Sequence, residues 1–232
     1  PLVATGLLLV FGFNVLTTIG QLLTQTSMAV IIAYTMPGMT AVLAAIFLRE
    51  RLGARQVAAV ALGMGGLAVL VSEDLAGIVA RPVGPIVMLL AALSWAGGNV
   101  LLKSRQWSLA ALPLTVWFFV ISAIACWPLV LIFEPPWQQS VPPLPVIAVL
   151  AYHVLGPMVV CYALWTVIVA RLPAAVAAIT ALLAPVVGVS SAVVLLGDPV
   201  SWQKTVALVM VLGSIALALV PGVAKLPTQS RA

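Results

Sequence analysis

The stretch Ile31-Ile32-Ala33-Tyr34-Thr35-Met36-Pro37 opens a pattern that this chain uses twice. Pro37 is followed thirteen residues later by Glu50, which is followed fifteen residues later by Gly65. The second copy lies 148 residues further on and has the same spacings, with Pro185, Asp198 and Gly213. In an apolar chain, a duplicated element of this kind is typical of membrane proteins built from two related halves.

The composition supports a membrane protein independently of the repeat. Of the 232 residues, 64% are hydrophobic and 6% are charged, with a mean hydropathy of +1.26. Soluble domains carry about 25% charged residues, so these charges are too few to solvate a water-soluble surface. The net charge of +5 therefore does not indicate a nucleic-acid partner. The composition predicts an all-α, polytopic helical protein of the lipid bilayer.

Apolar runs of membrane-spanning length recur along the whole chain. The runs and the breaks between them predict about eight transmembrane helices, at 3–22, 28–48, 56–72, 84–102, 112–133, 146–170, 174–196 and 204–220.

The positive charges separate between the two sides of the membrane that these spans imply. One side carries eight of the ten Lys and Arg residues, and the other side carries only Arg81 and Lys204. The eight are Arg49, Arg51, Arg55, Lys103, Arg105, Arg171, Lys225 and Arg231. By the positive-inside rule, we expect both termini to face the cytoplasm, and we expect an inner, plasma-membrane location in a bacterium.

The two copies of the pattern are predicted to have opposite orientations. Pro37 and Pro185 lie in the second and seventh spans, and an odd separation places equivalent helix ends on opposite membrane faces. Residues 84–221 then form a complete five-helix unit, and residues 1–73 form the last three helices of an earlier unit, with a polar tail at 222–232. The sequence thus predicts a ten-helix protein of which this chain begins at the third helix.

Further motifs resemble a known family. The helix with Pro37 leads to Arg49-Glu50-Arg51-Leu52, and Pro185 leads to Gly197-Asp198. Trp95-Ala96-Gly97-Gly98-Asn99 precedes Lys103, and Tyr162-Ala163-Leu164-Trp165 precedes Arg171-Leu172-Pro173-Ala174. In order and spacing, these segments resemble EamA-type members of the drug/metabolite transporter superfamily, which have two inverted five-helix repeats. Asp198 in place of the usual glutamate, and Pro199 after it, depart from the family pattern.

The prolines and carboxylates of the repeat are the first candidates for function. Pro37 and Pro185 each remove a helix hydrogen bond, and so they are either structural kinks or hinges whose freed carbonyls face a substrate cavity. Glu50 and Asp198 end their helices, which favours a structural or gating role over proton carriage.

Polar and amphipathic side chains inside the spans are the candidates for contact with a solute. Uncharged polar groups in lipid normally face the protein interior, and these are Asn14, Tyr34, Trp95, Asn99, Tyr162 and Trp165. Interhelical bonding is the alternative for Asn14 and Asn99. His153 is either a packed or interfacial helix residue, or a cavity residue that binds solute or senses protons. No second His, Cys or acid stands at ligand spacing, so no metal site and no cofactor is predicted.

These features favour a secondary-active transporter of small organic solutes that works by alternating access between inverted repeats. A non-transporting scaffold or lipid-handling protein on the same helices is the alternative. No nucleophile–base pair or nucleotide-binding motif is present, so an enzyme is not expected. The expected partners are a small-molecule solute and lipid. Proton coupling and a homodimer stay open.

Overall fold

The computed structural model describes residues 1–24, 29, 32–50, 52–72, 81–138, 140–184, 186–187 and 201–219. Within these ranges the regular structure is helical and no strand occurs. The sequence-based predictions for Arg51, Pro185, Asp198, Lys225 and Arg231 concern residues outside these ranges. The predicted all-α membrane fold is confirmed, and in the part of the chain that the structure describes five helices are long and apolar enough to cross a bilayer.

The first spanning helix, Leu2–Leu23, is continuous but changes its hydrogen-bond register. It consists of α1 (Leu2–Gly6), a π-helical segment η1 (Leu7–Gly12) and α2 (Phe13–Leu23). The sixth span has the same construction, with α9 (Leu144–His153), a π-helical segment η4 (Val154–Cys161) and α10 (Tyr162–Arg171). Adding 148 to the bounds of η1 gives 155–160, which lies inside η4. The repeat therefore extends to the backbone geometry of the two helices.

The remaining helices follow the predicted apolar runs. They are α4 (Met36–Phe47), α5 (Ala54–Val71), α7 (Val83–Lys103), α8 (Ala111–Phe133), α11 (Ala174–Thr180) and α13 (Trp202–Leu219). A short 3₁₀ turn, η3 (Pro136–Gln138), lies in the proline-rich connection after α8.

The helix expected at 28–48 is interrupted, so Pro37 does not lie in the middle of a continuous span. The chain turns at Tyr34 and Thr35, and α4 begins at Met36 with Pro37 in its first turn. A proline there costs little, because the first backbone N–H groups of a helix have no partner within it. In the second copy α11 ends at Thr180 and is followed by a turn at Ala181 and Leu182. Both copies therefore contain a broken helix.

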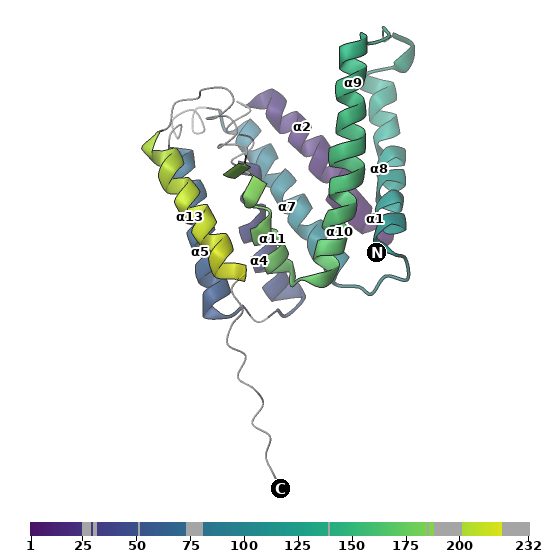
Figure 1. The fold of residues 1–232 in the computed structure, drawn as a ribbon. Helices are drawn as coiled ribbons and strands as arrows, with labels where there is room; N and C mark the ends of the chain where they lie inside the picture. Colours follow the sequence, from purple (N-terminus) through teal and green to yellow (C-terminus); the bar gives the residue numbers. More distant parts are fainter. Residues whose placement is uncertain are drawn as a thin grey trace.

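Three groups of helices lie side by side in Figure 1. The pair α5 and α13 forms one edge, α8, α9 and α10 lie at the opposite edge, and α4, α7 and α11 lie between them. The tertiary contacts agree, because α5 packs chiefly on α13, while α7 packs on α2, α4 and η1. The broken helices α4 and α11 contact each other in the middle.

The α5–α13 contact is reciprocal under the 148-residue shift. A Cβ atom added to Gly65 would lie 2.8 Å from Met210 Cε, and one added to Gly213 would lie 3.2 Å from Leu62 Cδ2. Leu62 and Met210 are repeat equivalents, as are Gly65 and Gly213. Two exchanged contacts of this kind are the property of a two-fold related interface. Because the numbers fall on α13 as they rise on α5, the two helices run antiparallel, as an inverted repeat requires.

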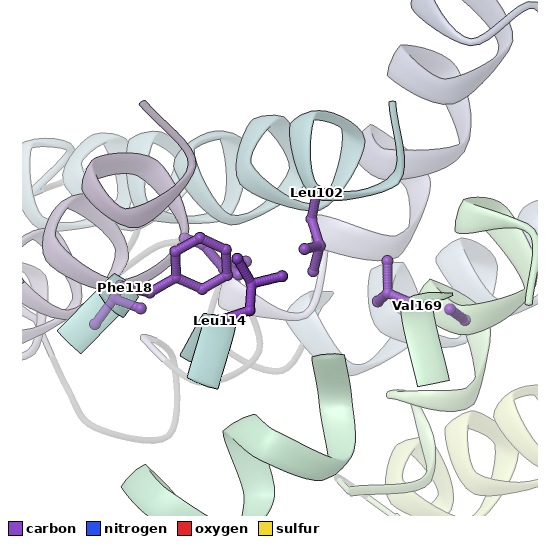
Figure 2. Close-up of a cluster of buried hydrophobic side chains, with 7 residues drawn as sticks. Leu102, Leu114, Phe118 and Val169 are labelled. Carbon is purple, nitrogen blue, oxygen red and sulfur yellow. The ribbon is translucent and has the colours of Figure 1, made fainter. Parts of the chain in front are cut away.

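Figure 2 shows the buried apolar cluster at the other side of the molecule. Leu102 of α7, Leu114 and Phe118 of α8 and Val169 of α10 meet there with Leu9 and Val10 of η1 and Ala177 of α11. Removing one such large side chain from a packed core costs about 2–5 kcal/mol. The cluster fixes α7, α8 and α10 around η1, and these elements carry the candidate site.

Candidate functional site

Five of the candidate residues predicted from the sequence lie together around the first spanning helix. They are joined by two phenylalanines in one group, here called the aromatic–amide cluster, which consists of Phe13, Asn14, Trp95, Asn99, Phe119, Tyr162 and Trp165. Helices α2, α7, α8 and α10 each contribute to it. The group therefore draws on both copies of the repeat.

Trp95 is the centre of the ring contacts. Its ring centroid lies 4.7 Å from that of Phe13, 5.7 Å from that of Tyr162 and 5.6 Å from that of Trp165. Phe119 lies against the other side of Tyr162 at 5.2 Å. Tilted and edge-on ring pairs at such separations are favourable by about 0.5–1.5 kcal/mol each. The rings thus form a connected surface of aromatic faces and edges within the bilayer-spanning region.

Two amide side chains connect this surface to the helices. Trp165 Nε1 donates to Asn99 Oδ1 at 2.7 Å, and Asn99 Nδ2 donates to the Trp95 carbonyl at 2.9 Å. Asn99 is 2% exposed, and a buried amide of this kind is costly unless it is bonded. Trp95 and Asn99 are four residues apart on α7, so they share one face of that helix.

The second amide joins the two copies at equivalent positions. Asn14 Nδ2 donates to Tyr162 Oη at 3.0 Å and to the Val10 carbonyl at 2.8 Å. Asn14 and Tyr162 are 148 residues apart, which is the repeat period. Two equivalent positions can touch only where they lie close to the pseudo-two-fold axis. The Asn14–Tyr162 bond therefore marks the axis between the copies.

The π-helical segment η1 offers backbone carbonyls to the surrounding helices. Ser94 Oγ donates to the Leu8 carbonyl at 2.7 Å, and Ser122 Oγ, which donates to the Phe118 carbonyl of its own helix at 2.7 Å, also lies 3.2 Å from the Gly6 carbonyl just before η1. Tyr162 Oη lies 3.5 Å from the Leu9 carbonyl. Single π turns inside helices occur frequently at functional sites, because the changed register frees carbonyls for other partners. In η1 the Leu8 and Leu9 carbonyls lie within reach of hydroxyls from α7 and α10.

Other candidates lie apart from this cluster. Tyr34 packs against the apolar cluster between α5 and α13, and Pro37 is buried in the first turn of α4. His153 is exposed at the end of α9. No hydrogen bond or ring contact in the described part of the chain joins these three to the aromatic–amide cluster.

Glu50 connects the two broken helices. Its Oε1 accepts a hydrogen bond of 3.0 Å from the backbone N–H of Ala174, the first residue of α11. A carboxylate at a helix N-terminus is stabilised by the free N–H groups and by the helix dipole. Arg49, directly before it, has a φ of +54° and turns the chain so that the Glu50 N–H reaches the Ala44 carbonyl. Glu50 therefore caps the N-terminus of α11 from the end of the helix that contains α4.

Three features of the site were missed in the sequence. No residue pattern in the sequence predicts the π-helical segments. Once one segment is known, the 148-residue spacing predicts the position of the other. Phe13 and Phe119 were missed because an apolar ring in an apolar span does not stand out. Ser94 and Ser122 could have been found as polar residues within spans, which normally face a protein interior.

Comparison with known proteins gives the family context of this geometry. Residues 1–72 and 82–220 match the model described as the EamA-like transporter family. A protein of Escherichia coli K12 named "Probable amino-acid metabolite efflux pump" is 29% identical over 180 residues, which is 75% of this chain and 60% of that protein. A protein of the same name from Salmonella typhimurium LT2 is 30% identical over 183 residues, 76% of this chain and 61% of that protein.

A solved crystal structure shows the same fold. It superposes with a TM-score of 0.77 over 93% of this chain and 76% of the other chain, at 20% sequence identity. The chain spans about 60% of the length of the two curated relatives it matches.

Proposed function

This chain belongs to the EamA-like transporter family, and on that premise we propose that it forms part of a secondary-active transporter of small organic solutes. The names of the two bacterial relatives support amino acids and related metabolites as the solutes and export as the direction. The family is one of integral membrane transporters rather than enzymes. No nucleotide-binding motif is present in the sequence, so a solute or proton gradient is the proposed source of energy.

The Asn14–Tyr162 hydrogen bond is the observation that supports alternating access most directly. In an inverted repeat the two copies exchange conformations when the protein switches between its two faces. Contacts away from the axis must then break and be replaced by their equivalents. A contact between equivalent positions can persist through the exchange. We therefore place the pivot at Asn14 and Tyr162, with the solute against the neighbouring aromatic and amide groups.

The chemistry of the aromatic–amide cluster suits a small solute with both apolar and polar parts. Trp95, Tyr162 and Trp165 offer ring faces and edges, and Asn99 and Trp165 offer a hydrogen-bonding pair. Sites for small molecules are generally apolar with a few placed polar groups. A solute can replace the Trp165–Asn99 bond with bonds of its own, so the desolvation of these groups is compensated in the bound state.

The repeat prolines and carboxylates have a proposed role in gating. Glu50 ties the end of α4 to the start of α11, so its hydrogen bond links the broken helices of the two copies. We assign Asp198 the equivalent role in the second copy, and Pro37 and Pro185 the role of hinges at the helix breaks. Tyr34 and His153 are kept as candidates for the entry path rather than the cluster.

Transport by the full-length protein in liposomes tests this proposal. We expect counterflow of labelled amino acids, and Asn99→Ala or Trp165→Phe should raise the solute concentration for half-maximal transport about tenfold, the equivalent of one lost hydrogen bond of 1–1.5 kcal/mol. Trp117→Phe is the matched control, because Trp117 is 49% exposed on α8 outside the cluster.

Three outcomes decide between the proposal and its alternatives. Unaltered counterflow in both cluster variants would contradict the assignment of the site. Binding and counterflow of no candidate metabolite would favour the scaffold or lipid-handling alternative. Collapse of an imposed pH gradient during transport would establish proton coupling.

A further inference from the structure

A pocket of about 390 Å³ lies away from the aromatic–amide cluster, at one end of helices α7, α8 and α10. Its walls come from the last residues of α7, the connection to α8, the first turns of α8 and the last turns of α10. Ten residues line it: Leu102, Lys103, Arg105, Gln106, Trp107, Leu109, Ala111, Leu114, Thr166 and Ala170. Because these positions are at the ends of spanning helices, the pocket lies at the level of the lipid headgroups.

The lining is divided between cationic and apolar groups. Lys103 and Arg105 both carry a positive charge, and none of the ten lining residues is acidic. The ammonium of Lys103 donates one hydrogen bond, to the Ala170 carbonyl at 3.3 Å, which leaves two of its three N–H groups for another acceptor. Arg105 is exposed at the rim, and its guanidinium can bind a phosphate through two parallel bonds.

The deeper part of the pocket wall is apolar, and its polar groups are already hydrogen-bonded. Leu102 and Leu114 are nearly fully buried and belong to the apolar cluster of Figure 2. The hydroxyl of Thr166 is paired with that of Thr115 at 2.9 Å, and Trp107 Nε1 is paired with the Leu102 carbonyl at 2.8 Å. The polar groups of the wall are therefore satisfied within the protein. An acyl chain can lie against this wall without leaving a polar group unbonded.

We propose that this pocket binds an anionic phospholipid, with its phosphate between Lys103 and Arg105 and the start of an acyl chain along Leu109 and Leu114. Basic pockets between spanning helices at the headgroup level are suited to such lipids. A free phosphate would be attracted by the same two cations but would make no use of the leucine wall. Leu109 is 40% exposed, so the apolar wall continues to the protein surface, where a chain can pass into the bilayer.

Trp107 provides a direct measurement because it lines the pocket. The full-length protein is titrated in nanodiscs with phosphatidylglycerol whose acyl chains are brominated near the headgroup, and quenching of tryptophan fluorescence is recorded. Brominated phosphatidylcholine is the zwitterionic arm, and inorganic phosphate is the competing free anion. Exposed tryptophans such as Trp117 are quenched by both lipids, so the signal of the pocket is the saturable excess of quenching by phosphatidylglycerol that Trp107→Phe removes. Quenching that is unchanged in Trp107→Phe overturns the proposal.

Charge removal tests the headgroup contact. Each cation near a membrane surface contributes about a fivefold increase in affinity for anionic lipid, so the double variant Lys103→Gln/Arg105→Gln should bind phosphatidylglycerol roughly 30-fold more weakly. Arg171→Gln is the matched control, since Arg171 is an exposed cation at the same end of α10 that does not line the pocket. The control should keep the preference for phosphatidylglycerol over phosphatidylcholine.

Three results would overturn the assignment. These are equal quenching by the two lipids, an equal loss of affinity in Arg171→Gln and in the double variant, and displacement of the lipid by inorganic phosphate at equal concentration. The last result would show that the site recognises a free anion rather than a lipid.

Discussion

The helices Leu2–Leu23 and Leu144–Arg171 occupy equivalent places in the two copies of the repeat, but their surroundings differ. Helices α7 and α8 pack against η1 in the first helix. In the second helix no residue of α9 or η4 is buried by the described part of the chain. Both helices nevertheless contain a π-helical segment in the same register. The backbone geometry is thus a property of the repeated helix, and the packing around it is not.

The residues that differ between the two helices explain this contrast. Gly6, Gly12 and Gly20 of the first helix correspond to Val154, Val160 and Ile168 of the second. The three glycines face Phe118, Ser94 and Met88 at short range. Val154 and Val160 are 51% and 53% exposed. Glycine allows the backbones of α7 and α8 to approach closely, whereas branched side chains keep a neighbour at a distance.

The largest expected effect comes from the glycine of α7 that meets the first helix. A Cβ atom on Gly98 would lie 2.7 Å from Leu9 N and 2.8 Å from Leu9 Cα, and these backbone atoms cannot move aside. We expect Gly98→Ala to lower the free energy of unfolding by about 3 kcal/mol, as overpacking does in a filled interior. Denaturation of the protein in micelles, followed by circular dichroism, measures this loss.

The neighbouring glycine is its control. A Cβ atom on Gly97 would meet only Leu8 Cδ1, at an ordinary 3.6 Å. Gly97→Ala should therefore be neutral or slightly stabilising, because alanine also favours the helix. Similar losses in the two variants would show that α7 does not depend on close approach to η1.

The second prediction exchanges residues between the two helices. Gly12→Val introduces the residue of the second copy, and its Cβ would lie 2.5 Å from Ser94 Oγ and 3.1 Å from the Leu7 carbonyl. We expect a loss of about 2 kcal/mol, since the contact with α7 must open. The reverse exchange, Val160→Gly, should cost only about 0.5 kcal/mol, the difference in helix propensity between valine and glycine. Thermal unfolding in the same detergent compares the two, and a larger loss for Val160→Gly would contradict the contrast.

The third prediction concerns the hydroxyl that holds the first π segment. Ser94 Oγ donates to the Leu8 carbonyl at 2.7 Å, and Ser94→Ala should cost about 1 kcal/mol, the usual net value of a hydrogen bond. Ser104→Ala is a matched control, because its Oγ bonds only within its own helix end, to the Leu101 carbonyl. A smaller loss for Ser94→Ala than for Ser104→Ala would show that η1 does not need its hydroxyl partners.

The sequence predicted the fold class and the members of the cluster better than it predicted where each helix faces. Asn14, Trp95, Asn99, Tyr162 and Trp165 were named as candidates because uncharged polar groups in lipid normally face the protein interior. Such arguments need a contrast between polar and apolar faces. A helix that is apolar all round has none.

Because these helices have no polar face, the sequence does not show which way their residues point. Tyr34 packs against the apolar cluster to which α5, α11 and α13 contribute, and His153 is exposed, although both lie in apolar spans like the cluster residues. A proline is compatible both with a kink inside a helix and with the first turn of a new helix. The sequence alone therefore does not show that α4 begins at Met36 and that Pro37 lies in its first turn. The glycine contacts of the first helix depend on the partner that approaches it, which local sequence does not specify.

The smallest effect is expected at the bond between the copies. Asn14 and Tyr162 hold equivalent positions, and one hydrogen bond of 3.0 Å from Asn14 Nδ2 to Tyr162 Oη joins them. A double-mutant cycle of Asn14→Ala and Tyr162→Phe should give a coupling energy of about 0.6 kcal/mol, the average for interhelical hydrogen bonds in a membrane protein. The pair Thr115 and Thr166, bonded at 2.9 Å between α8 and α10 within the second unit, is the reference cycle, since a bond within one unit does not depend on how the two units are placed. If the bond between the copies is a pivot, its cycle should couple equally in protein trapped in either orientation, as the threonine cycle does. Coupling between Asn14 and Tyr162 in only one orientation would contradict their placement at the axis. The two helices would then be equivalent in sequence, but the contact between them would not be a pivot for the conformational change.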